Sequence, residues 1–178
     1  MELFEAIKGR HSYRGAFKDQ EVRREHLKLI VEAGLLAPSG ANAQTTSFVI
    51  VDNPELLATI GKMHKSNQAM QQAKGMIACI ADKEPLPVYE NFHFQTEDLA
   101  AAVQNMLLAI TALGYASVWI DGWLRLEGQA ERINHLLQVP PAKTVRVLLP
   151  IGVPLEPPTA KEKKGFSERA WFNRYGEA

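Results

Sequence analysis

Short apolar runs alternate with amphipathic segments along most of this sequence, and that alternation restricts the possible folds more than any other feature. The runs have the length and composition of buried strands and cover residues 48–51, 76–81, 117–120 and 144–151. Apolar side chains at helical spacing predict helices over residues 2–9, 24–36, 96–113 and 127–137, with another that begins at Pro54. Taken alone, the alternation predicts a doubly wound parallel sheet covered by helices.

The phosphate-binding turn of such a fold is missing from the sequence. No Gly-x-Gly-x-x-Gly follows any of the predicted strands. That glycine pattern is what lets the backbone of a dinucleotide-binding fold approach a phosphate closely. Its absence weakens the prediction of a doubly wound sheet.

The composition is that of one ordinary globular domain. The 178 residues suffice for a sizeable core, with 46% apolar and 22% charged residues. Lysine plus arginine and aspartate plus glutamate number 20 each, so the formal net charge is zero. Because nucleic-acid-binding proteins usually carry a basic excess, we expect no nucleic-acid partner.

Several features predict a cytoplasmic protein with no membrane association. No apolar run reaches the roughly 18 residues that a membrane-spanning helix needs. The N-terminal residues 1–5 are acidic and amphipathic, unlike a signal peptide. The single cysteine, Cys79, excludes an internal disulfide framework and fits a buried small side chain. A reducing compartment is consistent with that cysteine content.

Residues 10–14 form a dense group of hydrogen-bond donors. Arg10, His11, Ser12 and Arg14 supply two guanidinium groups, an imidazole and a hydroxyl. Guanidinium groups match phosphate oxygens bidentately, and a serine hydroxyl can add another bond. The group follows the C-terminal end of a predicted helix, where the macrodipole repels anions, so side chains would have to hold any phosphate. The alternative is a solvated basic loop.

A second loop, residues 37–44, consists of small and amide residues. Pro38, Ser39 and Gly40 would let a flat ligand or another backbone approach closely, and Asn42 and Gln44 offer amides that can match the edge of a heterocycle. The alternative is an ordinary connection between a helix and a strand.

Together, the two loops resemble the FMN-dependent nitroreductase family. The resemblance rests on Arg-His-Ser-x-Arg from residue 10 and Ala-Pro-Ser-Gly-x-Asn-x-Gln from residue 37. It extends to the region of Asn67, to Ile120-Asp121-Gly122 and to the basic C-terminal segment. The resemblance implies an α+β fold, with a mixed or antiparallel sheet flanked by helices, assembled as an intertwined homodimer. FMN would then lie between the subunits.

The resemblance also implies roles for particular residues. Arg10, His11 and Ser12 would face the phosphate and ribityl end of FMN, and Arg14 would lie nearer the pyrimidine ring. There a cation stabilises the negative charge that reduced flavin gathers. Five residues of the second loop would come from the partner subunit: Pro38, Ser39, Gly40, Asn42 and Gln44.

The remaining implied residues lie later in the chain. Asn67 would read the polar edge of the flavin, and the segment of Asp121 and Gly122 would donate a backbone amide to flavin N5. Lys161 and Lys163 would lie near the phosphate, with a solvated tail as the alternative. Residues 1–154 would form the FMN-binding domain, and residues 155–178 a basic extension packed on the partner subunit.

The sequence departs from the family pattern at two places. The family often has Pro-Trp after the second loop, where this chain has Thr45-Thr46. It often has glutamate where Asp121 stands, so contacts over the flavin ring could differ.

The implied activity is that of an FMN-dependent NAD(P)H oxidoreductase. NAD(P)H would reduce the flavin and leave, and an electron-poor small molecule such as a nitroaromatic, quinone or activated alkene would then be reduced in the same cleft. No general acid or base is assigned, because the flavin carries the chemistry. The alternatives are a flavin-binding regulatory or storage dimer without turnover, and an oxygen-using or dehalogenating flavin relative.

Other side chains receive simpler interpretations. The remaining histidines are His26, His64, His93 and His135. They lack the spacing of metal ligands, so we expect no metal site. The aromatic residues that could stack on a substrate are Trp119, Trp123, Tyr89 and Phe92. For the two tryptophans the alternative is a place in the core or in a cleft wall.

Overall fold

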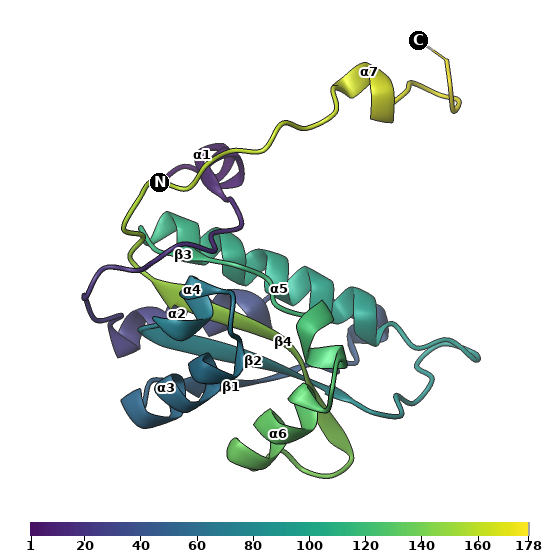
Figure 1. Cartoon of the computed structure of the whole chain (residues 1–178). Coiled ribbons are helices and arrows are strands. Elements are labelled where there is room, and N and C mark those ends of the chain that lie inside the picture. Colours follow the sequence, from purple (N-terminus) through teal and green to yellow (C-terminus); the bar gives the residue numbers. More distant parts are fainter. Residues whose placement is uncertain (178) are drawn as a thin grey trace.

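An antiparallel sheet of four strands forms the centre of the protein, for which a computed structural model describes residues 1–177 (Figure 1). The strands are β1 (Ser47–Val51), β2 (Gly75–Asp82), β3 (Ala116–Ser117) and β4 (Lys143–Gly152). They lie in the order β1-β2-β4-β3, and every neighbouring pair is antiparallel. The α+β fold is therefore confirmed, and the doubly wound parallel sheet that the alternation alone predicts is wrong.

The burial of β2 explains why the alternation misleads. All residues of β2 from Gly75 to Ala81 are buried, so the strand forms one continuous apolar run. Such runs are typical of parallel sheets, because helices usually cover both faces of a parallel sheet. Here helices cover both faces of an antiparallel sheet, and the alternation of polar and apolar residues disappears for the same reason.

The predicted helices are present, with their ends shifted by a residue or two. The helices are α1 (Leu3–Gly9), α2 (Arg24–Leu35), α3 (Pro54–Met63), α4 (Gln68–Gln71), α5 (Gln95–Ala112), α6 (Gln129–Leu136) and α7 (Phe166–Arg169), with 3-10 turns η1 (Gly40–Asn42) and η2 (Gly122–Arg125). The strand predicted over residues 117–120 is shorter, because the chain leaves the sheet after Ser117 and pairs again only where Ile120 meets Leu148.

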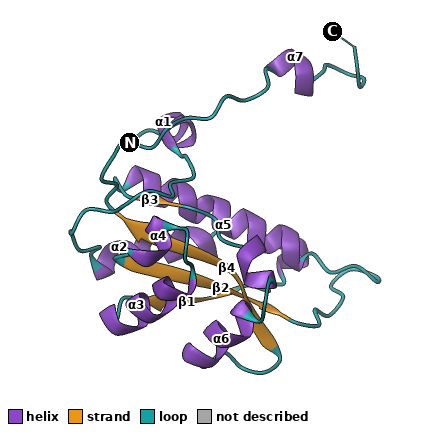
Figure 2. Cartoon of the chain, viewed as in Figure 1, coloured by secondary structure: helices purple, strands orange, loops and turns teal. Residues whose placement is uncertain are grey.

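The sheet has helices on both of its faces (Figure 2), and it separates two hydrophobic cores. On one face, α2 and α5 pack against a core that includes Ile77 and Leu149. On the other face, α3, α4 and α6 pack against a core that includes Ala78 and Leu148. Successive residues of the central strands thus point to opposite cores, as the two-residue period of a strand requires.

The loop after α1 runs along the β3 edge of the sheet. Ser12 forms a parallel bridge with Ser117, and the Tyr13 amide donates to the Ser117 carbonyl at 2.9 Å. The buried Tyr13 hydroxyl donates to the Ala16 carbonyl at 2.5 Å and accepts from the Leu155 amide at 3.2 Å. Tyr13 therefore holds together the first loop and the beginning of the C-terminal segment.

The C-terminal segment extends away from the two-core body (Figure 1). Its residues from 155 to 177 are mostly exposed, and α7 is its one helix. Near the end, the rings of Phe166 and Phe172 lie 5.9 Å apart, and those of Trp171 and Tyr175 lie 4.0 Å apart. Within residues 1–177, no helix combines the length and apolar character that crossing a membrane would require.

A close contact at Gly61 generates a stability prediction. A Cβ at this position would lie 2.6 Å from the Met70 carbonyl oxygen, where α3 meets α4. We expect Gly61→Ala to lower the free energy of unfolding by about 1–3 kcal/mol in a urea titration, because backbone must move to admit the methyl group. Lys62→Ala, at the exposed neighbouring position, should stay within about 0.5 kcal/mol of the parent. A Gly61→Ala protein more stable than the parent, as helix propensity alone would give, would contradict the contact.

Candidate functional site

Two cavities that share Arg14 bring together several of the residues singled out from the sequence. One has a volume of about 560 Å³, and its lining includes Ser12, Arg14 and Lys161. The other has a volume of about 280 Å³, and its lining includes Arg14, Asn67, Asp121 and Gly122. These residues come from four separate parts of the chain, and the fold brings them together around the two cavities.

The larger of these two cavities has a cationic and hydroxylic lining. Arg14 and Lys161 supply positive charge and Ser12 supplies a hydroxyl, while Glu156 is the acidic residue of the lining. Guanidinium, ammonium and hydroxyl groups are the usual side-chain ligands of phosphate. This cavity can therefore accommodate an anionic group.

Three of the cationic residues predicted for that end lie outside both cavities. Arg10 is the C-cap of α1, and its backbone amide donates to the Ala6 carbonyl. Arg10 and the next residue, His11, are both half-buried. Lys163 is exposed on the C-terminal segment. Neither cavity is lined by Arg10, His11 or Lys163.

Asn67 lies buried in the lining of the smaller cavity. Its side chain is 4% exposed, and Oδ1 accepts a hydrogen bond from the Met70 amide at 3.2 Å. Asn67 is thus the N-cap of α4, which fixes the orientation of the side chain. With Oδ1 engaged in the cap, the Nδ2 group is the donor that Asn67 can offer to a ligand.

The carboxylate of Asp121 is held by two arginines. Arg125 donates to both of its oxygens, at 2.8 Å and 2.9 Å, and Arg146 forms a further ion pair with it. Partial burial raises the pKa of Asp121, but the hydrogen bonds and charges of Arg125 and Arg146 outweigh it, and the pKa falls below its ordinary value. The side chain is therefore an anion neutralised by its partners.

The backbone amides of Asp121 and Gly122 have no hydrogen-bond partner in the described residues, unlike the Asp121 carboxylate. Within residues 1–177, neither amide donates a hydrogen bond to another backbone or side-chain group. A Cβ at Gly122 would meet no atom within 4 Å, so the space before it is open. Both amides are consequently available as donors to a bound molecule.

Five further lining residues were not assigned to the cofactor from the sequence. They are His64, Ser66, Trp119, Ile120 and Trp123. The His64 ring lies against that of Trp123, with centroids 4.8 Å apart and planes inclined by 32°. Burial lowers the pKa of His64 below its ordinary value, with a smaller opposing contribution from its backbone hydrogen bond. No motif marks His64, since it comes three residues before Asn67 with no other signal.

The loop of residues 37–44 lies at the opposite edge of the sheet. The loop precedes Ser47 of β1, which pairs with Ile80 of β2. Ser12 instead adjoins Ser117 of β3. Ser117 pairs with Ile151 of β4, and Ile151 pairs with Gly75 at the other end of β2. Strand spacing and rise put Ser12 roughly 25 Å from Ser47. Within one chain, the structure therefore does not bring this loop to the cavities that contain Arg14.

Asp98 fixes the shape of that loop. Its buried carboxylate accepts from the Gly40 amide and from the Thr45 hydroxyl, both at 2.8 Å. The loop backbone is unusual, with positive φ angles of 50° at Ala41, 54° at Asn42 and 50° at Gln44. Pro38, Ser39 and Gln44 line a cavity of only about 40 Å³. Hydrogen bonds thus fix the loop, but the cavity that it lines is too small for a cofactor.

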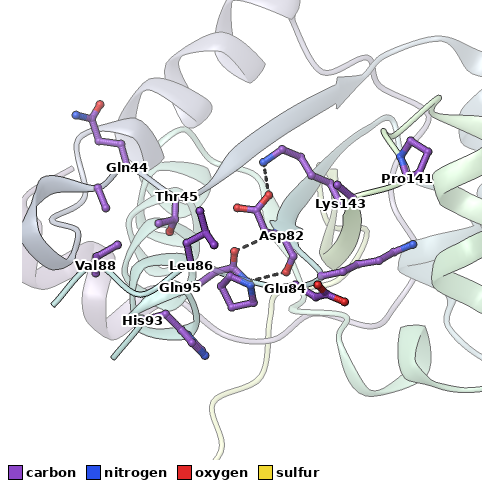
Figure 3. A pocket seen from close by; sticks show the side chains of 14 residues that line it. Gln44, Thr45, Asp82, Glu84, Leu86, Val88, His93, Gln95, Pro141 and Lys143 are labelled. Atoms are coloured by element: carbon purple, nitrogen blue, oxygen red, sulfur yellow. Dashed lines mark hydrogen bonds and ion pairs between the residues drawn. The ribbon is translucent and has the colours of Figure 1, made fainter. Parts of the chain in front are cut away.

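A separate cavity of about 780 Å³ opens beside Gln44 (Figure 3). At its base, Lys143 donates to Asp82 at 2.6 Å, and the Gln95 side chain bonds both the amide and the carbonyl of Asp82. Its wall includes Leu86, Val88 and His93. Gln44 is the one residue of this lining that the family resemblance had assigned to the cofactor. Within residues 1–177, no group of three or more His, Cys, Asp or Glu side chains is arranged to hold a metal ion.

The ion pairs of Asp121 predict a pH-dependent contribution to stability. Asp121→Asn should destabilise the protein at neutral pH, because the arginines lose their anion. The folded-state pKa lies below the roughly 3.9 of an unfolded aspartate, so the stabilisation is complete above about pH 5 and disappears as the pH falls through the folded-state pKa. Urea titrations of both proteins across that range should therefore converge in acid.

Glu131→Gln is the matched control, since this carboxylate is exposed on α6. Its stability difference from the parent should be small at every pH. A difference between Asp121→Asn and the parent that stays constant on acidification would show that the carboxylate is not stabilised by its arginines.

Known proteins resemble this chain in sequence. The sequence matches the family model described as "Nitroreductase family" over residues 7–84 and 61–153. A protein of Methanothermobacter thermautotrophicus, provisionally named NADH dehydrogenase/NAD(P)H nitroreductase, is 31% identical over 164 residues, which are 91% of this chain and 82% of that protein. A similarly named protein of Archaeoglobus fulgidus is 30% identical and covers 94% of this chain and 90% of its own length.

Solved structures show the same likeness. An FMN-dependent nitroreductase of Clostridium difficile superposes with a TM-score of 0.78 at 28% identity, covering 97% of this chain and 99% of its own. A provisionally named nitroreductase of Desulfovibrio desulfuricans, solved in complex with FMN, gives a TM-score of 0.75 at 29% identity and covers 91% of each chain. The chain therefore belongs to the nitroreductase family, a family of oxidoreductases.

Proposed function

We propose that this protein binds FMN in the two cavities that meet at Arg14 and uses it to pass a hydride from NAD(P)H to an electron-poor acceptor. FMN is the cofactor of the nitroreductase family, and the relatives are named for NAD(P)H. The observation that carries the proposal is the gathering of Ser12, Arg14, Asn67, Gly122 and Lys161 around two cavities that share Arg14. The acceptor would be a nitroaromatic, a quinone or an activated alkene.

The donor groups fit the two chemically different ends of FMN. Ser12, Arg14 and Lys161 suit a phosphate, and the larger cavity that they line has about 560 Å³. Asn67 and the free amides of Asp121 and Gly122 suit the polar edge of a heterocycle, and they line the smaller cavity. Arg14 lines both cavities, so one cation would serve the ring end as well.

When bound, FMN would supply the atom N5, which accepts a hydride from NAD(P)H and returns it to the acceptor. Arg14 favours negative charge in the cavity, which is the charge that the reduced ring gathers. Asp121 does not oppose that charge, because Arg125 and Arg146 neutralise its carboxylate. The backbone amides at Asp121 and Gly122 are fixed donors that need no rearrangement during transfer. One cleft that serves donor and acceptor in turn gives ping-pong kinetics.

The proposal includes a second copy of the chain. Pro38, Ser39, Gly40, Asn42 and Gln44 lie at the edge of the sheet opposite to Arg14, so they could reach its flavin only from a partner subunit. Large apolar side chains are exposed close to that loop and on the first helix: Leu35, Leu36, Leu3, Phe4 and Ile7. The extended segment of residues 155–177 also leaves aromatic side chains exposed, which a partner subunit would cover.

The remaining assignments rest on the family resemblance. We assign Arg10, His11 and Lys163 to the phosphate end of FMN, although they line neither cavity. Arg10 and His11 are close to Ser12 in the sequence, and Lys163 is close to Lys161. The division into an FMN-binding domain of residues 1–154 and a C-terminal extension belongs to the same proposal. So does the cytoplasm as the compartment, for which the argument is the single cysteine.

The visible spectrum of the purified protein is the first test. We expect bound FMN, bleaching of the flavin when NADH or NADPH is added without air, and its reoxidation by menadione or nitrofurazone. Steady-state rates against both substrates should give parallel double-reciprocal lines. FMN that neither NADH nor NADPH bleaches would instead indicate a flavin-binding protein without turnover, and colourless protein that gains no activity from added FMN would refute the proposal.

Arg14→Ala tests the centre of the proposed site. A charged hydrogen bond contributes about 1.5–3 kcal/mol, so the dissociation constant of FMN should rise by roughly 10- to 100-fold. This dissociation constant is measured from the quenching of flavin fluorescence when FMN is titrated with apoprotein. Arg24→Ala is the matched control, since Arg24 is exposed, is paired with Asp52 and lines neither cavity. Equal FMN affinity in Arg14→Ala and Arg24→Ala would contradict the placement of the cofactor.

Leu36→Glu tests whether FMN binding requires the partner subunit. Leu36 is 83% exposed and directly precedes the second loop, so a carboxylate there should oppose an apolar interface. Size-exclusion chromatography with absorbance at two wavelengths should show a shift to monomer, and the monomer fraction should lack flavin. Lys28→Glu, on the exposed face of α2, should leave both dimer and flavin unchanged. A monomer that retains FMN would refute the shared site.

A further inference from the structure

The smaller cavity contains polar and aromatic side chains that the proposed cofactor does not use. Arg14, Asn67 and the amides of Asp121 and Gly122 account for one part of its lining. His64, Ser66, Trp119 and Trp123 make up much of the rest. His64 is the one of these four that is titratable and can both donate and accept a strong hydrogen bond. It lies in the same hollow as the groups proposed for the flavin ring.

The backbone of His64 is fixed at the end of α3. Its amide donates to the Gly61 carbonyl at 3.2 Å. Its carbonyl and that of Lys65 both accept from the Gln71 side chain, at 3.0 Å and 2.9 Å. The turn that carries His64 is therefore bonded to α4, the helix that Asn67 caps. The positions of His64 and Asn67 are determined together.

The ring of His64 is fixed by a second contact. It lies against Trp123 in η2, with centroids 4.8 Å apart, in a geometry typical of favourable aromatic pairs. Trp123 follows Gly122 directly, so the backbone amides and the imidazole are held by one short turn. An imidazole kept in one orientation loses little entropy when it binds a ligand.

The ring nitrogens of His64 bond no other residue within the described part of the chain. The one hydrogen bond that bears on the pKa of the ring is to the backbone of His64 itself. The carboxylate nearest along the cavity lining is Asp121, and it is already bonded to Arg125 and Arg146. Because burial disfavours the charged ring, His64 is a neutral imidazole at neutral pH, with one N–H to donate.

We propose that His64 donates a hydrogen bond to an oxygen of the electron acceptor, a nitro oxygen or a quinone carbonyl, and that Trp123 holds the imidazole for this contact. The inference rests on the proposed function, since it assigns a role toward the acceptor of the same cavity. Such a bond withdraws charge from the acceptor and fixes its oxygen beside the fixed amide donors. It selects acceptors that present oxygen, and His64 becomes a specificity-determining residue.

Two substitutions separate the hydrogen bond from the shape of the side chain. His64→Phe keeps a planar ring that can lie against Trp123 but removes both nitrogens. His64→Gln restores an N–H donor of similar reach. Lys65→Gln is the matched control, because Lys65 is the exposed neighbour and lies outside the cavity lining. Thermal unfolding of all three verifies that each is folded.

The probe is menadione, a quinone, in two measurements on the flavin-loaded protein. The first is its dissociation constant for the oxidised protein without NAD(P)H, from perturbation of the flavin spectrum. The second is the ratio of kcat/KM for menadione to that for ferricyanide, an acceptor that presents no oxygen. For His64→Phe, we expect the dissociation constant to rise and the ratio to fall, each about three- to tenfold. His64→Gln should recover at least part of both changes, and Lys65→Gln should show neither.

The outcomes distinguish this inference from the function on which it rests. A flavin-loaded, NAD(P)H-reducible His64→Phe protein whose menadione affinity and kcat/KM ratio equal those of the parent would overturn the inference alone. Equal losses in His64→Phe and His64→Gln would also overturn it, because the N–H would not be the group that matters. A parent protein that binds no flavin would overturn the proposed function, and the inference with it.

Discussion

The burial of β2 on both faces is the constraint on which the rest of the structure depends. A strand without a polar face requires helices above and below the sheet, and the protein meets this with α2 and α5 on one side and α3, α4 and α6 on the other. Polar groups then have no place at the centre of the sheet, since burying them without partners is costly. The candidate site therefore lies at the edge, where β3 is only two residues long.

That short edge strand lets other segments reach the sheet. Ser12 pairs with Ser117 and Ile120 pairs with Leu148, and between them Val118 and Trp119 pair with no neighbouring strand. The Tyr13 hydroxyl joins the same edge to Leu155, so the N-terminal loop and the C-terminal segment meet at one buried oxygen. Arg14, Gly122 and Lys161 become neighbours of the cavities for this reason, although they are far apart in sequence.

The sequence predicts the elements of this fold well and their pairing poorly. Apolar spacing locates the long helices and three of the four strands to within a residue or two, because burial imposes that spacing locally. It misses the early end of β3 and the short helices α4 and α7. Strand direction depends on how each connection returns to the sheet, and double-sided burial removes the alternation that would have indicated an antiparallel sheet. The first loop motif marks Arg14, because its chemistry is concentrated in a short run, and the family resemblance adds Gly122. His64 carries no such signal, because contacts of the folded chain place it in the cavity: the bonds of its turn to Gln71 and the contact of its ring with Trp123.

The separation of the two loop motifs gives the proposed homodimer its physical reason. Residues 10–14 and residues 37–44 lie at opposite edges of one sheet, and the two cores between them leave no path by which one chain could bring them together. Asp98 nevertheless holds the second loop in a strained shape, with positive φ at three residues that carry a Cβ. If a partner subunit completes each site, every bound FMN contacts both chains, so cofactor affinity and subunit affinity are linked quantities. A substitution that weakens FMN binding must then reduce the stabilisation that FMN gives to the dimer, and one that weakens the dimer must reduce the apparent affinity for FMN.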